Sequence, residues 1–401
     1  MVDTYNKKSN ETGFLKYSLF VTFFPQLIAG PIVHHSEMMP QFNNLKKKIT
    51  PINNVATGAT IFTLGLFKKV ILADGIGAYA TPIFDASEAG LIISFFEAWV
   101  GAFAYTLQLY FDFSGYSDMA IGIAVMFGIT LPLNFNSPLK SHNIIMFWSK
   151  WHITLSRFIQ DYIYTPISLP LSRLSILGGY GNLNFFFASV VLPTMIAFLL
   201  AGLWHGAGWN FVIFGLLHGF YLTLNQSWIF FKKYVGYKSE KFLIVRIFIG
   251  KFLTLISILI GFVFFRSESV GGAVNILYAM AGGNGLVLPE HYLIKLSEHT
   301  SITKFLIEIG VDFEGSARYF TIHACFSILC LLGVVFMFPN TLQFIGKYWE
   351  GNKKYGLIRQ KGWVGLLHWQ PNTFWAIVIG LMFCFCMVNL VKQSEFLYFQ
   401  F

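Results

Sequence analysis

The chain has 401 residues, of which 55% are hydrophobic and only 12% are charged. An ordinary soluble domain has about 25% charged residues, so this composition excludes a typical soluble protein and predicts a polytopic membrane protein. The net charge of +9 comes from short lysine clusters between apolar segments, which is typical of loops that orient membrane helices and contact a lipid bilayer. A nucleic-acid-binding protein would need a soluble basic face, so no nucleic-acid partner is expected.

Long hydrophobic segments follow one another along the chain, and several contain no Asp, Glu, Lys or Arg over about the 20 residues that span a bilayer. In chain order they cover residues 14–33, 54–73, 91–111, 119–133, 184–203, 208–231, 252–265, 319–338 and 372–391. Pro25, Gly30 and Pro31 interrupt the first segment, so we expect it to be re-entrant, because broken backbone at membrane depth needs protein or a cavity around it. The pattern predicts an all-α polytopic membrane helix bundle with re-entrant and interfacial helices.

We expect a single membrane-embedded domain over residues 1–401. Residues 134–180 are too rich in charge for a lipid-exposed span, which favours an amphipathic interfacial helix or a polar helix enclosed by the bundle. Residues 266–318 are more polar and have a glycine-rich centre. They predict one long extramembrane loop with room for a short helix.

His205 ends an uncharged segment, between Trp204 on one side and Gly206 and Gly208 on the other. Glycines let backbone or substrate approach closely, and Trp204 can form a wall of a site. An ionisable group at membrane depth is a functional-site candidate. Low dielectric favours the neutral imidazole, which can accept a proton as a general base. The alternative is a structural histidine that bonds a neighbouring helix.

His152 lies in a polar segment that also contains Trp148, Trp151 and Ser156. Helical spacing places His152 on one face with Trp148 and Ser156. His152 could orient His205, bind substrate or line a donor channel. A purely structural role for His152 is the alternative. The two histidines predict one buried site assembled from two distant segments. No metal is expected there, because the H-x-x-x-H spacing and a Cys or carboxylate partner are both absent.

A compact polar cluster separates two of the apolar segments and consists of Asp112, Ser114, Ser117 and Asp118. Its carboxylates and hydroxyls are able to line a polar cavity or orient a histidine. Capping of the following helix through Ser117 or Asp118 is the alternative.

Two further polar features lie in the apolar parts of the chain. Arg157 and Asp161 have i, i+4 spacing, so together with Tyr164 they predict an internal polar network. His218 is also placed inside an apolar segment, where we expect a packing and hydrogen-bonding role.

At these residues the chain resembles the membrane-bound O-acyltransferase family, in particular its bacterial branch of polysaccharide O-acetylation proteins. The stretches that carry the resemblance are residues 24–33, 111–118, 147–156, 157–166 and 202–211. The resemblance implies a helix bundle around a central funnel, with His205 as the catalytic histidine and His152 as the second characteristic histidine. The substrate-binding residues expected around them are Trp151, Ser156, Asp161, Tyr164, Trp204 and Asn210, with Asp112, Ser114, Ser117 and Asp118 from the polar cluster.

The resemblance also implies an activity, in which an acetyl group from acetyl-CoA or another cytoplasmic acyl donor crosses the bundle. The donor is a co-substrate, and no bound cofactor is expected. The acceptor is a cell-envelope or exported polysaccharide, reached directly or through an extracytoplasmic acetyltransferase or esterase-like partner. The expected location is the bacterial inner membrane, as a multi-pass protein. Transfer of D-alanine to teichoic acid and a non-catalytic acyl transporter or scaffold are the alternatives.

Relatives of this family carry several membrane helices before the stretch that corresponds to residues 24–33. The chain is therefore expected to be a fragment, a product of internal initiation or a shortened homologue.

Overall fold

A computed structural model describes residues 5, 13–27, 30–43, 52–179, 181–236, 242–296, 300–314, 317–351, 368–390 and 397. These residues are mostly helical, and their strands form a two-stranded parallel sheet in which β1 (Leu286–Pro289) pairs with β2 (Val311–Glu314). The predicted all-α bundle is thus confirmed.

The α-helices are α2 (Phe14–Thr22), α3 (His35–Asn43), α4 (Ile52–Phe67), α5 (Asp74–Glu88), α6 (Phe95–Met126), α7 (Ile144–Trp148), α8 (Ile153–Ile159), α9 (Thr165–Leu177), α10 (Asn182–Phe186), α11 (Leu192–His205), α12 (Trp209–Tyr234), α13 (Leu243–Arg266), α14 (Val270–Met280), α15 (Glu290–Leu296), α16 (Thr300–Glu308), α17 (Ile322–Met337), α18 (Thr341–Ile345) and α20 (Thr373–Asn389). Short 3-10 turns are η1 (Phe24–Gln26), η4 (Pro138–Lys140) and η7 (Gly346–Tyr348). Wider π-helical turns are η3 (Lys68–Ala73), η5 (Gln160–Tyr164) and η6 (Phe187–Val191), and they join neighbouring α-helices into longer ones.

Three of the described helices are long and apolar enough to cross a membrane, namely Ile52–Glu88, Asn182–His205 and Leu243–Arg266. The pair Ile322–Met337 and Thr341–Tyr348 adds a fourth if its two parts, bent by 50°, form one span. The first expected segment is interrupted as its sequence predicts, because α2 ends at Thr22 and Pro25 lies in the turn η1. Whether this segment re-enters the membrane stays a prediction.

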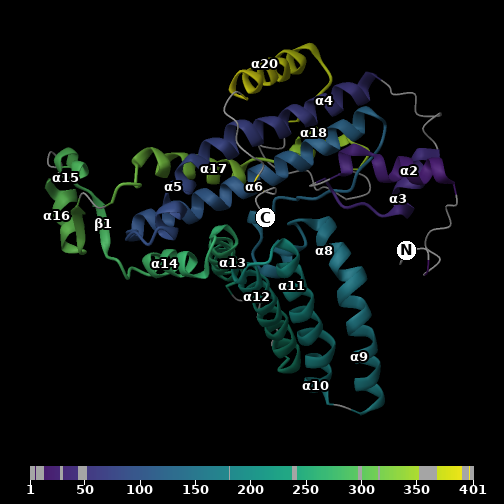
Figure 1. The fold of residues 1–401 in the computed structure, drawn as a ribbon, viewed down its shortest axis with the longest axis horizontal. Helices are drawn as coiled ribbons and strands as arrows, with labels where there is room; N and C mark the ends of the chain where they lie inside the picture. Colours follow the sequence, from purple (N-terminus) through teal and green to yellow (C-terminus); the bar gives the residue numbers. More distant parts are fainter. Residues whose placement is uncertain are drawn as a thin grey trace.

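Helices α4, α5 and α6 run along the long axis of the molecule, and α9, α10, α11 and α12 project to one side from its middle (Figure 1). Helix α6 packs against α4, α5, α13, α14 and α17, and α13 in turn packs against α12, so α13 connects α6 to the second group. Two clusters of buried apolar side chains lie along α6, one shared with α5, α12, α13 and α14 and the other with α3, α4 and α18.

Helix α6 corrects the expectation of two hydrophobic segments at 91–111 and 119–133. It is one helix of 32 residues that begins with a capping box, in which Ser94 and Glu97 bond each other's backbone amides. The polar cluster lies in its middle, so capping of a following helix by Ser117 or Asp118 is wrong. The helix continues through the cluster, and Asp112, Ser117 and Asp118 each have a polar partner on another segment.

Glycines allow α4 and α6 to touch through their backbones. A side chain at Gly58 would collide with the backbone of Gly122, and one at Gly65 with the backbone of Gly115. Small residues at such spacing are typical of helix contacts in membranes, where close packing replaces the hydrophobic drive for association.

This close contact brings cations of one helix to carboxylates of the other. Lys68 Nζ lies 2.6 Å from Asp118 Oδ2, and Lys69 Nζ lies 3.0 Å from Asp112 Oδ1 and 2.7 Å from Asp74 Oδ1. Both lysines belong to the π-helical turn η3. Asp112 and Asp118 are almost completely buried, so the lysines neutralise charges that the apolar interior would otherwise exclude.

Residues 266–318 contain more structure than the expected loop with one short helix. The described part has α14, α15 and α16 and both strands of the sheet. Its first helix is held by Glu88, whose carboxylate accepts hydrogen bonds from the backbone amides of Glu268 and Ser269. The expectation that this region lies outside the membrane stays a prediction.

Replacing Lys69 with Met should destabilise the protein by about 3–5 kcal/mol, because it leaves Asp112 as an uncompensated buried charge. Thermal unfolding in detergent would measure this, with Lys233→Met at an exposed position as the control. The double variant Lys69→Met with Asp112→Asn should recover much of the loss. Equal melting temperatures for Lys69→Met and the control would show that the ion pair contributes nothing.

Candidate functional site

His205 is the last residue of α11, at the point where the chain turns back into α12. The two helices pack closely because Gly202 and Gly215 face each other's backbone, and a side chain at either would collide with the opposite helix. The ring of His205 lies edge to face on Phe265 of α13, with 5.0 Å between centroids. The glycine contact therefore places His205 between three helices.

His152 precedes α8 in a left-handed backbone conformation, with φ 43° and ψ 53°. Such a conformation is costly for a residue other than glycine and persists only where the surroundings hold it. Here the backbone oxygen of Asn134 accepts a hydrogen bond from the amide of Ile153. The Asn134 side chain bonds the amide and hydroxyl of Thr154 and lies 3.0 Å from Nδ1 of His152.

Both histidines line one small cavity. Its volume is about 30 Å³, and its other walls are the apolar side chains of Leu109, Phe113, Trp148, Trp151, Leu155, Phe214, Phe262 and Phe265. This volume matches about one water molecule, so the cavity has room for reacting atoms and not for whole substrates. The expected convergence of two distant segments is thus present in the structure, while the catalytic roles of the two histidines stay predictions.

A second, larger pocket adjoins this cavity. Its volume is about 350 Å³, and it is lined by Ile32, Leu155, Phe158, Ile159, Ile163, Leu200, Ala201 and Trp204. Leu155 belongs to both spaces, and the ring of Trp204 lies 4.9 Å from that of His205. Trp204 is 53% exposed, so it borders the way from the protein surface towards His205.

The other predicted substrate-binding residues differ in where they lie. Trp151 lines the histidine cavity. Ser156, Tyr164 and Asn210 donate hydrogen bonds to the backbone oxygens of Trp148, Ser189 and Ser267 respectively, so their polar atoms hold the backbone together.

The predicted network of Arg157, Asp161 and Tyr164 is wrong in its acidic partner. Arg157 makes a two-pronged ion pair with Glu37 of α3, at 2.8 Å and 3.1 Å, and Asp161 is exposed. The spacing from Arg157 to Asp161 is suitable for an ion pair, but the Glu37 carboxylate lies within hydrogen-bond distance of both terminal nitrogens of Arg157 and takes that place.

The polar cluster of α6 divides between two faces of the helix. Asp112 and Asp118 face the lysines of η3 and are part of the ion-pair network. Phe113 and Ser117, four residues apart, face the other way, towards the histidines. The ring of Phe113 meets that of His152 edge to face, and Ser117 Oγ accepts a hydrogen bond from the Asn134 amide. Ser114 is buried, with no hydrogen-bond partner for its hydroxyl among the described residues.

His218 lies one aromatic layer away from the cavity. Trp148 Nε1 donates a hydrogen bond to its Nδ1, and the ring packs against Phe214 and beside Gly261. These contacts agree with the packing and hydrogen-bonding role expected for His218. Asn134 is not among the predicted site residues, although the sequence places it with Asn136 and Ser137 at a polar edge that follows an apolar segment.

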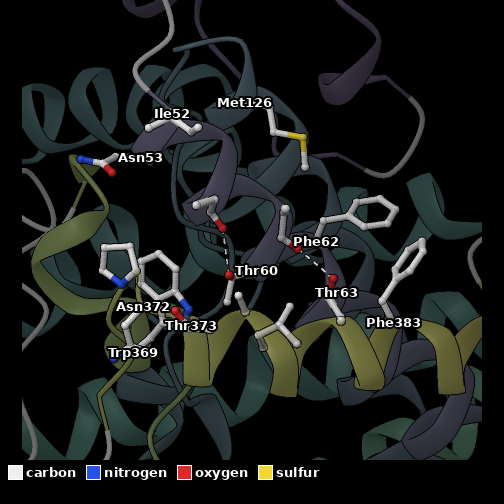
Figure 2. Close-up of a pocket in the computed structure, with 16 residues that line it drawn as sticks. Ile52, Asn53, Thr60, Phe62, Thr63, Met126, Trp369, Asn372, Thr373 and Phe383 are labelled. Atoms are coloured by element: carbon white, nitrogen blue, oxygen red, sulfur yellow. Dashed lines mark hydrogen bonds between the residues drawn. The ribbon is translucent and has the colours of Figure 1, made fainter.

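A pocket of about 900 Å³ lies elsewhere, between α4 and α20 (Figure 2). Thr60 and Thr63 face it, but each hydroxyl donates to a backbone oxygen of its own helix, those of Ala56 and Ala59. None of the predicted site residues lines this pocket. Its walls are mostly apolar, and its described lining residues include no histidine, acid or other side chain that could act as a base, so the histidine cavity is the candidate active site.

Comparisons with known proteins agree with the geometry. The sequence is 38% identical over 389 residues to a peptidoglycan O-acetyltransferase of Helicobacter pylori, and the matched region covers 97% of this chain and 64% of the relative. It is 36% identical over 281 residues to a probable alginate O-acetylase AlgI of Pseudomonas aeruginosa, covering 70% of this chain and 48% of the relative. A teichoic acid D-alanyltransferase of Streptococcus thermophilus is 27% identical over 226 residues, 55% of this chain and 52% of that protein.

The chain thus spans about two thirds or less of the length of these relatives. The profile of MBOAT, the membrane-bound O-acyltransferase family, matches residues 2–270, which include both histidines and every element that lines their cavity. The resemblance seen in the tryptophan and histidine stretches is therefore confirmed, and this membrane protein belongs to the membrane-bound O-acyltransferase family.

Proposed function

We propose that this protein is an O-acyltransferase that moves an acetyl group from a cytoplasmic donor across the membrane for O-acetylation of a cell-envelope or exported polysaccharide. The observation that carries the proposal is the cavity shared by His152 and His205. Its mostly apolar walls keep bulk solvent away, and it has room for reacting atoms and not for whole substrates, which limits hydrolysis of the acyl group.

In this proposal His205 is the general base. It accepts the proton of an acceptor hydroxyl while the hydroxyl oxygen attacks the acyl carbonyl carbon. A C–O bond forms and, for a thioester donor such as acetyl-CoA, the C–S bond breaks. The proton then passes from His205 to the thiolate that leaves, so the histidine returns to its neutral form. His152 supports this step from the opposite side of the cavity.

The donor reaches His205 through the pocket beside Trp204. Its apolar lining and volume of about 350 Å³ suit the uncharged arm of a carrier that bears the acetyl group. Lys140, Lys150 and Lys251 lie close enough together for their charges to interact, and this group of positive charges suits the negatively charged part of such a donor. Burial lowers the pKa of Lys140, and the positive charges of Lys150 and Lys251 lower it further, so an anion would relieve their repulsion.

The proposed acceptor is a polysaccharide hydroxyl, reached directly or through an extracytoplasmic acetyltransferase or esterase-like partner. The proposed location is the bacterial inner membrane, as a multi-pass protein with the lysine-rich loops on the cytoplasmic side. Transfer of D-alanine to teichoic acid is the second candidate. It is favoured less, because the relatives named for that reaction are less similar and match a shorter part of the chain.

Replacing His205 with Ala should lower acetyl transfer at least about 100-fold, because general acid–base catalysis contributes about 10²–10⁴ in rate. The assay follows radiolabelled acetyl groups from acetyl-CoA to polysaccharide in membranes that contain the protein. His323→Ala, at an exposed position on α17, is the matched control and should keep full activity. A well-inserted His205→Ala variant with normal transfer would contradict the catalytic role.

The same assay separates the enzyme from its alternatives. Transfer by the purified protein in detergent, where no gradient exists, would contradict a transporter. Labelled D-alanine on its carrier protein, offered in place of acetyl-CoA, should give no product. Efficient D-alanyl transfer would favour the second candidate.

Replacing Lys140 and Lys150 together with Met should raise KM for acetyl-CoA about tenfold and leave kcat nearly unchanged, because the lysines attract the anionic donor without taking part in the chemistry. Steady-state kinetics at low and high salt would check this, since the wild-type KM should rise with salt and that of the variant should not. A fall in kcat with unchanged KM would contradict a donor-binding role.

A further inference from the structure

The orientation of the Asn134 side chain follows from its neighbours. Asn134 is completely buried in the segment that follows α6. Its Oδ1 lies 3.4 Å from the backbone nitrogen of Thr154 and 2.9 Å from the Thr154 hydroxyl. A backbone N–H can only donate, so the atom facing it must be the amide oxygen. The amide nitrogen then donates to Ser117 Oγ, 3.2 Å away.

This orientation decides which nitrogen of His152 carries the proton. Nδ1 of His152 lies 3.0 Å from Asn134 Oδ1, an atom that can only accept a hydrogen bond. Nδ1 must therefore be the protonated nitrogen. In a neutral ring the lone pair is then on Nε2, for which no hydrogen bond to the described residues is found. Since the ring lines the cavity, Nε2 is left to accept a proton or hydrogen bond there.

His218 shows the opposite arrangement in the same aromatic cluster. The indole N–H of Trp148, which can only donate, points to Nδ1 of His218 at 3.3 Å. Nδ1 of His218 must accept, so its proton is on Nε2. The surroundings thus select one tautomer for each ring, and His218 is an internal reference for His152.

Asn134 also helps to hold the backbone of His152 in its left-handed conformation. The Asn134 backbone oxygen bonds the Ile153 amide, and its side chain bonds Thr154. Thr154 in turn accepts a hydrogen bond from the amide of Ile32, in the segment that follows α2. The ring position and its protonation pattern therefore depend on the same asparagine.

We propose that Asn134 is a positioning residue that fixes His152 as the Nδ1–H tautomer and turns its proton-accepting Nε2 towards His205 and the substrate. His152 then acts as a hydrogen-bond acceptor that holds the acceptor hydroxyl or the His205 ring during transfer. The catalytic part of this inference rests on the proposed acyl transfer, whereas the tautomer does not depend on it.

The test is nitrogen NMR of the full chain in lipid bilayers with ¹⁵N-labelled histidine, which separates protonated from unprotonated ring nitrogens. Loss of a signal in His152→Gln and in His218→Gln assigns the two rings. In the wild type, His152 should show a protonated Nδ1 and an unprotonated Nε2, and His218 the reverse. A protonated Nε2 on His152 would overturn the proposal.

Two variants at the same position separate tautomer control from folding. Asn134→Asp keeps an acceptor opposite Nδ1, so the tautomer should be retained. Asn134→Ala removes it, so His152 should populate both tautomers and acetyl transfer should fall at least about tenfold, as for other groups that orient a reacting histidine. If Asn134→Ala does not fold, the Asn134→Leu variant replaces it. Loss of the His152 Nδ1–H signal in folded Asn134→Leu would support the same role of Asn134.

Two controls complete the experiment. Ser117→Ala removes only the group that accepts from the Asn134 amide, and Thr154→Val removes one of the two hydrogen bonds from Thr154 to its oxygen. Both should keep the Nδ1–H tautomer. An unchanged tautomer in the alanine variant would overturn the inference. Absence of acetyl transfer in the wild type, with the tautomers as expected, would contradict the proposed function and leave the role of Asn134 in place.

Discussion

Buried polar groups in an apolar helix bundle need partners within the protein, because neither lipid nor packed side chains can replace the hydrogen bonds of water. This requirement explains why segments far apart in the chain meet near the middle of α6. Lys68 and Lys69 reach Asp118 and Asp112 from the turn η3. On another face of α6, Ser117 reaches Asn134, which holds the residues around His152.

The close helix contacts make these partnerships possible. Glycines let α4 and α6 touch, which brings Lys68 and Lys69 close enough to form ion pairs with the carboxylates of Asp118 and Asp112. A second glycine pair, Gly202 and Gly215, lets α11 and α12 touch beside His205. The histidine is thereby held between Phe214 and Phe265, and its ring has little freedom to leave the cavity. The close packing of the helices and the pairing of their polar groups thus act together to fix the position of the site.

The cavity gives the two histidines different chemical situations. His205 lies beside the exposed Trp204 and the larger pocket, which is the proposed entry of the donor. His152 is buried behind it, and its backbone and one ring nitrogen are bonded to the rest of the protein. One histidine that is reached by the reactants and exchanges protons with them, and a second that is fixed and orients the first, suit acyl transfer better than two equivalent bases.

The sequence by itself determined the helical class, the membrane setting, the family and the two histidines, because apolar segments of spanning length and tryptophan–histidine stretches are local patterns. Local patterns also predicted the break of the first segment at Pro25 and the packing role of His218. Only the tertiary structure decided that residues 95–126 are one helix, that Arg157 pairs with Glu37 rather than with Asp161, and that Asn134 bonds His152. Each of these three findings depends on which residue, distant in the sequence, lies nearby once the helices pack. The spacing of residues in the sequence does not contain that information.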